Sequence, residues 1–164
     1  PQAWDCLARA ERLARGTRLA GNVAGHMAVL EEDELKADGG RQGFLWWAWT
    51  VPARRRIRQR FEAAIRLNLE GHPPDPRSGV YWETKFGDFL MRTGDPEEAM
   101  QVYDRAWDRC VRSGLDAKCR LDLHHSRGLA YLALGDYLSA RDEFETGRGV
   151  AIEIGDRAVE AQLT

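Results

Sequence analysis

The sequence predicts an all-α fold built from antiparallel helical hairpins. The clearest pattern runs from Gly128 to Ala140, where apolar residues at helical spacing stop at Gly135 and a second apolar face begins after Asp136. The same arrangement is present 41 residues earlier in the chain. The matching pairs are Gly94 and Gly135, Ala99 and Ala140, and Tyr103 and Phe144. Recurrence at a fixed period is typical of an array of repeated hairpins.

The N-terminal segment is rich in Ala, Leu, Arg and Glu and is expected to form two helices, near Trp4–Arg15 and Thr17–Lys36. Gly16, Gly21 and Gly25 weaken the second helix by up to about 1 kcal/mol each relative to Ala, unless they allow a neighbour to approach. We therefore expect close packing at these glycines. The acidic run Glu31–Glu34 is expected to be a solvated face.

An apolar run, Gly43–Trp49, precedes Pro52 and the basic segment Arg54–Glu70. Proline disfavours helix in the residue before it and is tolerated in a first helical turn. Pro52 is therefore predicted to separate a short apolar helix from a longer basic one, and the two would form another hairpin. In the second of these helices, Phe61 lies 42 residues before Tyr103, so the repeat extends backwards with weaker matching.

The rest of the chain has stronger helix signals. Gly71–Gly79 contains three prolines and two glycines and is predicted to be a loop. A hairpin then runs from Val80 to about Arg112, and Asp95-Pro96 begins its second helix with a cap and a first-turn proline. Two further helices are predicted at Ala117–Leu134 and from Asp136 to near Ile154.

We expect a single helical repeat domain over residues 1–164, because the repeat phase matches on both sides of the proline-rich loop. Its parts are a helical N-terminal segment that is a degenerate repeat (1–38), a second degenerate repeat (41–70), two well-marked repeats (80–112 and 117–154) and the start of a further repeat (156–164). The sequence is expected to be a fragment of something longer, since it starts at Pro and stops partway through a helical pattern.

The matching positions resemble those of a tetratricopeptide repeat. They are Gly87 and Gly128, Leu90 and Tyr131, Ala99 and Ala140, Tyr103 and Phe144, Ala106 and Gly147, and the turns Gly94-Asp95 and Gly135-Asp136. The usual repeat has about 34 residues, so the longer period here implies about two additional helical turns in each unit. Longer repeats similar to these are found in kinesin light chain, spindle-orientation adaptors and bacterial STAND-type regulators.

The resemblance implies a right-handed superhelix, or α-solenoid, whose first helices line a concave groove that holds a peptide. Projecting the repeat register onto the chain points the following residues towards the groove: Trp46, Trp49, Tyr81, Thr84, Asp88, Met91, Arg92, Asp122, His125, Leu129 and Leu132. Aromatic residues and Met in such a groove suit a hydrophobic or amphipathic helical ligand. The alternative for the tryptophans is that they are core residues of a short helix.

The sharpest local charge feature is a run of five arginines: Arg54, Arg55, Arg56, Arg58 and Arg60. On one helix Arg54 and Arg58 point away from Arg56 and Arg60, so the run does not form one tight stripe. A solvated outer face, or pairing with the acidic run, is favoured over contact with nucleic-acid phosphates. The net charge of −2 gives no global electrostatic reason to expect a nucleic-acid partner.

Nothing in the sequence indicates catalysis, a cofactor or a metal. His124 and His125 point about 100° apart on a helix, and neither has a partner three or four residues away as HExxH would supply. The chain has no nucleophile motif and no phosphate-binding loop. Cys6, Cys110 and Cys119 match no zinc or redox spacing, which suits reduced thiols in a cytosolic protein without a structural disulfide. No run approaches the roughly 18 apolar residues of a membrane helix.

We therefore expect a non-catalytic, cytoplasmic protein-interaction module that binds a helical or extended segment of a partner or of its own longer chain. Two alternatives stay open. One is a sensor or autoinhibitory repeat domain of a bacterial signalling or transcriptional regulator. The other is an assembly component that contacts nucleic acid through Arg54–Arg60.

Overall fold

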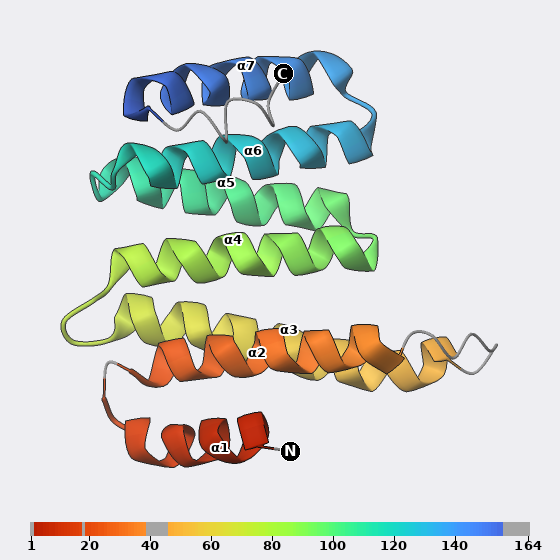
Figure 1. Cartoon of the computed structure of the whole chain (residues 1–164), viewed down its shortest axis with the longest axis vertical. Helices are drawn as coiled ribbons and strands as arrows, with labels where there is room; N and C mark the ends of the chain where they lie inside the picture. The colour runs from red at the N-terminus through yellow and green to blue at the C-terminus, as the bar shows by residue number, and fades with distance from the viewer. Residues whose placement is uncertain (1, 18, 39–45, 156–164) are drawn as a thin grey trace. The chain divides into compact units, whose positions relative to one another are not determined.

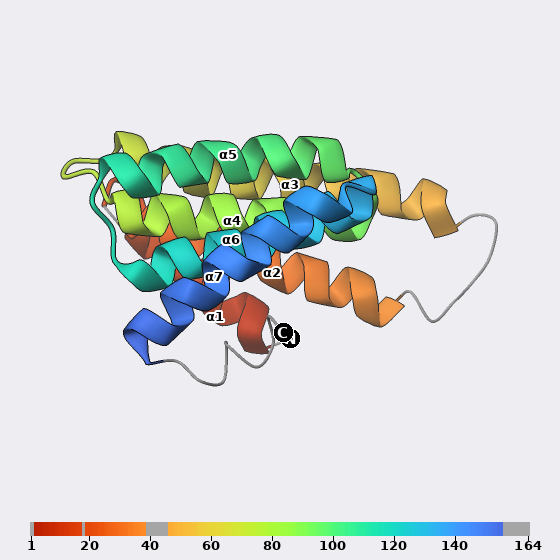
Figure 2. The same cartoon turned by 90° about the horizontal axis from the view of Figure 1, so that it is seen from above.

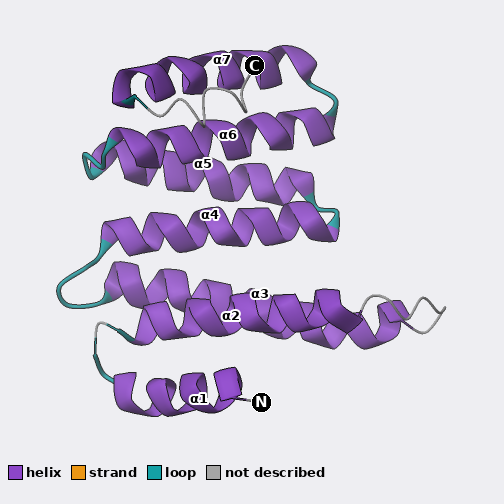
Figure 3. Ribbon diagram, viewed as in Figure 1, coloured by secondary structure: helices purple, strands orange, loops and turns teal. Residues whose placement is uncertain are grey.

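The computed structural model describes residues 2–17, 19–38 and 46–155, and nearly all of these are helical (Figures 1 and 3). The helices are α1 (Gln2–Ala14), α2 (Ala20–Asp38), α3 (Trp46–Glu70), α4 (Pro76–Thr93), α5 (Pro96–Arg112), α6 (Ala117–Leu134) and α7 (Tyr137–Ile154). The described part of the chain contains no strand. The all-α class is confirmed, and the two N-terminal helices lie within three residues of their predicted limits.

The chain forms two compact units, Pro1–Trp82 and Glu83–Thr164, and the boundary between them falls inside α4. Within each unit, helices that follow one another in the chain pack together. In the first unit α1 packs on α2 and α2 on α3, and in the second unit α5 packs on α6 and α6 on α7. The pairing of α6 with α7 is visible in both views (Figures 1 and 2). The single repeat domain expected from the sequence stays a prediction.

The first unit is organised around the antiparallel pair α2 and α3. Arg60 Nε of α3 lies 2.9 Å from Glu31 Oε1 of α2, while Gly21 near the start of α2 packs against Asn68 near the end of α3. A Cβ at Gly21 would lie 2.3 Å from Nδ2 of the Asn68 side chain, so α2 and α3 can approach this closely only because this residue is Gly. The close packing predicted at Gly21 is confirmed. The same prediction at Gly16 is wrong, because Gly16 lies between α1 and α2 with a φ of +75°, and a Cβ there would meet nothing within 4 Å.

Trp82, near the middle of α4, is also held by α2. A Cβ at Gly25 would lie 2.4 Å from Trp82 Cδ2, which confirms the close packing predicted there. The Trp82 indole N–H donates to Asn22 Oδ1 at 2.9 Å, and the His26 ring meets the indole edge to face at 5.1 Å between centroids. Trp82 is almost completely buried and satisfies its one polar group, as a buried indole requires.

The hairpin predicted at 41–70 is wrong, because α3 is a single helix that continues through Pro52. Proline removes one hydrogen-bond donor and crowds the carbonyl four residues before it. Pro52 lies only six residues after the first residue of α3 and is exposed, so the cost falls in the first two turns, where water can solvate the backbone. Ile57 and Phe61 are fully buried and hold the rest of α3 in the first unit. The partner of α3 in the hairpin is therefore α2.

The loop predicted to reach Gly79 ends earlier, because α4 begins at Pro76. The Ser78 N–H donates to Asp75 Oδ1 at 3.0 Å, so Asp75 caps the helix and Pro76 takes the first helical position. Gly79 is part of the helix. A Cβ there would lie 2.3 Å from Leu69 Cδ2, so this glycine lets α4 approach α3.

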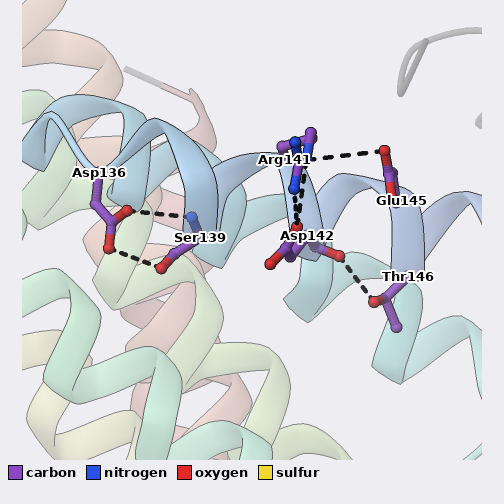
Figure 4. Close-up of polar contacts among 6 residues, drawn as sticks. All are labelled: Asp136, Ser139, Arg141, Asp142, Glu145 and Thr146. Atoms are coloured by element: carbon purple, nitrogen blue, oxygen red, sulfur yellow. Dashed lines mark hydrogen bonds and ion pairs between the residues drawn. The ribbon is translucent and has the colours of Figure 1, made fainter.

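Both predicted Gly-Asp turns of the second unit are confirmed. Gly94 and Gly135 have φ values of +87° and +80°, a left-handed conformation that favours glycine. Asp95 then caps α5 by accepting from the Glu98 N–H at 3.3 Å, and Asp136 caps α7 by accepting from Ser139 at 3.1 Å (Figure 4). Because the turns repeat 41 residues apart, the two hairpins have the same internal register.

Candidate functional site

The second unit contains eight of the eleven predicted groove residues. Thr84, Asp88, Met91 and Arg92 lie on α4, and Asp122, His125, Leu129 and Leu132 lie on α6. Tyr81 lies on the part of α4 that belongs to the first unit, where about half of its surface is exposed. Trp46 and Trp49 are in the first turn of α3, and their side chains lie outside the described residues. Their place in a groove stays a prediction.

Tyr103 of α5 is tied to α4, the helix that carries four of the predicted groove residues of the second unit. Its hydroxyl donates to Asp88 Oδ1 of α4 at 2.9 Å. Burial, reinforced by the negative charge of Asp88, raises the pKa of Tyr103 far above its ordinary value. The phenol therefore stays a neutral donor, and it holds α5 to α4 at the level of Asp88.

Four side chains form one face of α6, hereafter the α6 face: Asp122, His125, Leu129 and Leu132. Gly128 and Ala130 beside them are buried, whereas Leu129 and Leu132 are 44% and 42% exposed. His125 is half-buried, and its ring lies 6.2 Å from the Phe144 ring of α7. The α6 face therefore has a partly fixed aromatic residue followed by two accessible leucines.

The carboxylates of this region already have cationic partners within the chain. Asp88 Oδ2 lies 3.3 Å from Lys85 Nζ, one turn earlier on α4, and Asp122 Oδ1 lies 3.4 Å from Lys118 Nζ on α6. Such exposed pairs contribute little to stability, but they reduce the local negative charge. The leucines are therefore the most distinctive chemical feature of the α6 face.

A partly buried polar cluster, which the sequence reasoning missed, fixes the rotation of α6. His124 Nδ1 lies 2.7 Å from Glu143 Oε2 of α7, and Arg127 Nη1 lies 3.2 Å from Glu143 Oε1. The Arg127 guanidinium also lies over the Trp107 ring of α5 at 5.6 Å and 3.4 Å from Asp104 Oδ1. Because these contacts hold one side of α6 against α5 and α7, the α6 face turns outwards.

One sequence signal could have located this cluster. Glu143 directly precedes Phe144, on the side of α7 where Ala140 and Gly147 are buried, and a carboxylate there requires a partner. A second buried carboxylate, Glu83 of α4, receives two hydrogen bonds of 3.1 Å from the Arg109 guanidinium of α5. Among the described residues, no group of three His, Cys, Asp or Glu side chains is arranged to hold a metal.

The outer surface of α7 differs from the α6 face. Figure 4 shows Arg141 paired with Asp142 at 3.1 Å and close to Glu145, while the Thr146 hydroxyl donates to the Asp142 carbonyl at 2.8 Å. All four residues are mostly solvated. These residues give the surface mixed charge. Leu138 and Ile152 are also exposed on α7, so this helix presents apolar side chains to solvent as well.

The five arginines of α3 separate into different environments. Arg60 pairs with Glu31 of the acidic run at 2.9 Å, as one of the sequence interpretations expected. Arg58 Nε lies 3.0 Å from Glu62 Oε1 on its own helix. Arg55 is exposed, whereas Arg56 and Arg60 line a cavity between α1, α2 and α3. The prediction that the run does not form one stripe is confirmed.

Comparison with known proteins gives no match, either to a protein-family model or to a curated protein. The likeness to tetratricopeptide repeats therefore rests on the residues quoted above and on the hairpin geometry. In the described part of the chain, every helix is too short or too polar to cross a membrane.

Proposed function

We propose that this protein is a non-catalytic interaction module that binds an amphipathic helical segment of a partner protein against the α6 face. The observation that carries the proposal is the exposure of Leu129 and Leu132 on a helix whose opposite side is held by the contacts of His124 and Arg127 with Glu143. An apolar pair held in place in this way needs no rearrangement before it binds, which lowers the cost of association.

The dimensions of the α6 face favour a helical ligand. Asp122 and Leu132 are ten residues apart, which is about 15 Å along a helix and matches about three turns of a bound peptide. The leucines are about 4.5 Å apart along the axis, so apolar ligand residues spaced three or four apart can cover both. The α4 residues Met91 and Arg92, one half-buried and one exposed, lie on the helix that Tyr103 of α5 holds through Asp88.

Covering the exposed parts of the two leucines is expected to contribute about 1 kcal/mol each. Loss of both contributions corresponds to a roughly 30-fold increase in Kd. The test is to select helical peptides from a displayed library against the whole chain and then to measure their Kd for variants. We expect the double substitution Leu129→Ala and Leu132→Ala to weaken binding by at least tenfold.

Leu138 and Ile152 of α7 supply the matched control, because they are more exposed, at 69% and 56%, and lie outside the α6 face. The pair Leu138→Ala and Ile152→Ala is expected to leave the Kd unchanged. Peptides that bind the Leu129→Ala, Leu132→Ala variant as tightly as the parent chain would contradict the proposal, and so would equal losses in both double variants.

Contact with nucleic acid through the arginines of α3 has less support. A phosphate backbone is bound by several free cations along one surface. Arg58 and Arg60 each have a carboxylate partner at 3.0 Å or less, and Arg56 and Arg60 face a cavity. The run therefore does not present a continuous cationic strip.

A further inference from the structure

The first unit contains a cavity of about 480 Å³ between α1, α2 and α3, far in sequence from the α6 face. This volume lies within the range of sites that bind small molecules. Its walls include Ala20 and Ala24 of α2, and Ala63 and Leu67 of α3. Small side chains on both facing helices leave the space open, and Gly16, with a φ of +75°, ends α1 at its edge.

The polar part of the cavity is cationic. Its charged and amide residues are Arg15, Arg56, Arg60, Glu11 and Gln59. Glu31 neutralises Arg60, so the guanidinium groups of Arg15 and Arg56 face the single carboxylate of Glu11. An excess of positive charge at a concave site attracts anions.

Two of these arginines are available to a ligand. Within the described part of the chain, neither Arg15 nor Arg56 forms an ion pair, and both are exposed. Arg60 is held in place instead: its Nε lies 2.9 Å from Glu31 Oε1 and its guanidinium lies 5.9 Å from the centre of the Trp4 ring. The cavity therefore combines one positioned cation with two uncommitted cations.

We propose that this cavity binds a small organic anion that carries a phosphate or carboxylate group and an amino group. Arginine is suited to such anions because its planar group forms two parallel hydrogen bonds to two oxygens. Glu11, at the same cavity, accepts hydrogen bonds from the amino group, and Gln59 supplies both a donor and an acceptor. The alanines and Leu67 cover the apolar body of the ligand.

The arrangement favours a small ligand over a polymer. Arg58 is bound to Glu62, and Arg55, which is exposed on α3, does not line the cavity. The uncommitted cations converge on one hollow, while a nucleic acid needs them spread along a surface. This inference is independent of peptide binding, since none of its residues belongs to the α6 face.

The test uses the whole chain labelled with ¹⁵N and follows the arginine Nε–H resonances by NMR. The probes are pyrophosphate, citrate and adenosine 5′-monophosphate, with adenosine as the uncharged control. We expect saturable shifts of the Arg15 and Arg56 resonances with adenosine 5′-monophosphate and with at least one of the two simple anions, and none with adenosine. Of the two simple anions, a response to pyrophosphate only identifies phosphate as the preferred anionic group, and a response to citrate only identifies carboxylate.

Two variants locate the site. Arg15→Gln combined with Arg56→Gln is expected to weaken adenosine 5′-monophosphate binding at least tenfold, while the control Arg55→Gln leaves it unchanged. Ala24→Leu, which fills the cavity without altering charge, is expected to abolish binding, with folding checked by thermal unfolding. The proposal is overturned if no probe gives a saturable shift, or if Arg55→Gln weakens adenosine 5′-monophosphate binding as much as Arg15→Gln combined with Arg56→Gln does. It is also overturned if a single-stranded oligonucleotide binds and Arg55→Gln weakens its binding as much as the double variant does.

Discussion

Gly128 of α6 lies directly against the ring of Phe144 of α7, and a methyl group in place of its hydrogen would lie 2.4 Å from Phe144 Cε1. The equivalent pair 41 residues earlier, Gly87 and Tyr103, has the same contact, with a corresponding distance of 2.3 Å. Carbon atoms that are not bonded to each other do not approach so closely. The two hairpins of the second unit are therefore built on one repeated contact, in which a glycine of the first helix admits an aromatic ring of the second.

Gly128→Ala is expected to destabilise the protein by about 1–3 kcal/mol, because the added methyl group overlaps a ring that is packed between helices. Gly149 of α7 is the matched control, since a Cβ there meets nothing within 4 Å. Gly149→Ala is expected to stabilise the protein by up to about 1 kcal/mol through helix propensity alone. Urea unfolding of both variants checks this, and a similar change in both would contradict the contact.

Capping of α4 makes stability depend on pH. Hydrogen bonds from Ser78, chiefly its backbone N–H, hold the pKa of Asp75 below its ordinary value of 3.8. A carboxyl whose folded pKa is depressed stabilises the fold fully above its unfolded pKa, and this contribution is lost as pH falls through the folded pKa.

Asp75→Ala is therefore expected to cost about 1 kcal/mol at pH 7, and the difference from the parent chain should shrink below pH 4. Asp75→Asn is the control, because it keeps a neutral cap that does not titrate. The free energy of unfolding at pH 7, 4 and 2.5 measures the effect. A difference between the parent chain and Asp75→Ala that stays constant over this range would show that the carboxylate does not cap α4.

The Tyr103 hydroxyl, which joins α5 to α4, is expected to contribute measurably to stability. Tyr103→Phe removes the 2.9 Å hydrogen bond to Asp88 and leaves the ring in place, so we expect a loss of about 1–2 kcal/mol. Tyr137→Phe provides the control, since Tyr137 is 71% exposed and its loss should change stability by less than about 0.5 kcal/mol. Chemical unfolding of the two variants compares them directly, and equal stabilities would exclude the joining role.

The three cysteines are expected to differ strongly in reactivity. Burial, helped by the neighbouring Cys110 thiol, raises the pKa of the Cys119 thiol, and Cys110 itself has no exposed surface. Alkylation requires the thiolate, so iodoacetamide at pH 8 should modify exposed Cys6 first. Mass spectrometry of the digested protein measures each rate. Modification of Cys119 as fast as Cys6 in the folded chain would contradict the packing of α5 on α6.

Local sequence signals predicted much of the fold. The Gly-Asp turns and the Asp95-Pro96 helix start determined α5 and α7, because capping depends only on neighbouring residues. Pro52 was misread for the same reason: the local rule predicts a break, but Pro52 is exposed in the first two turns of α3, where water can solvate the backbone groups that proline leaves unpaired.

Contacts between helices were harder to predict. The pairing of His124 with Glu143, 19 residues away, depends on how two helices are rotated about their axes, and one sequence does not determine that rotation. The cavity of the first unit depends on the fold of α1, α2 and α3 together. The repeat register did place Leu129 and Leu132 on one face of α6, and both are exposed there. Whether that face binds a partner stays a prediction.

The account depends most on where a helical peptide binds, and methyl NMR of the leucine-labelled chain tests this directly. On titration with a library-selected helical peptide, the methyl resonances of Leu129 and Leu132 should shift and saturate together, while those of Leu13 and Leu138, exposed elsewhere, should not move. Saturable shifts at Leu13 or Leu138 with none at Leu129 and Leu132 would contradict the proposal that the α6 face is the binding surface.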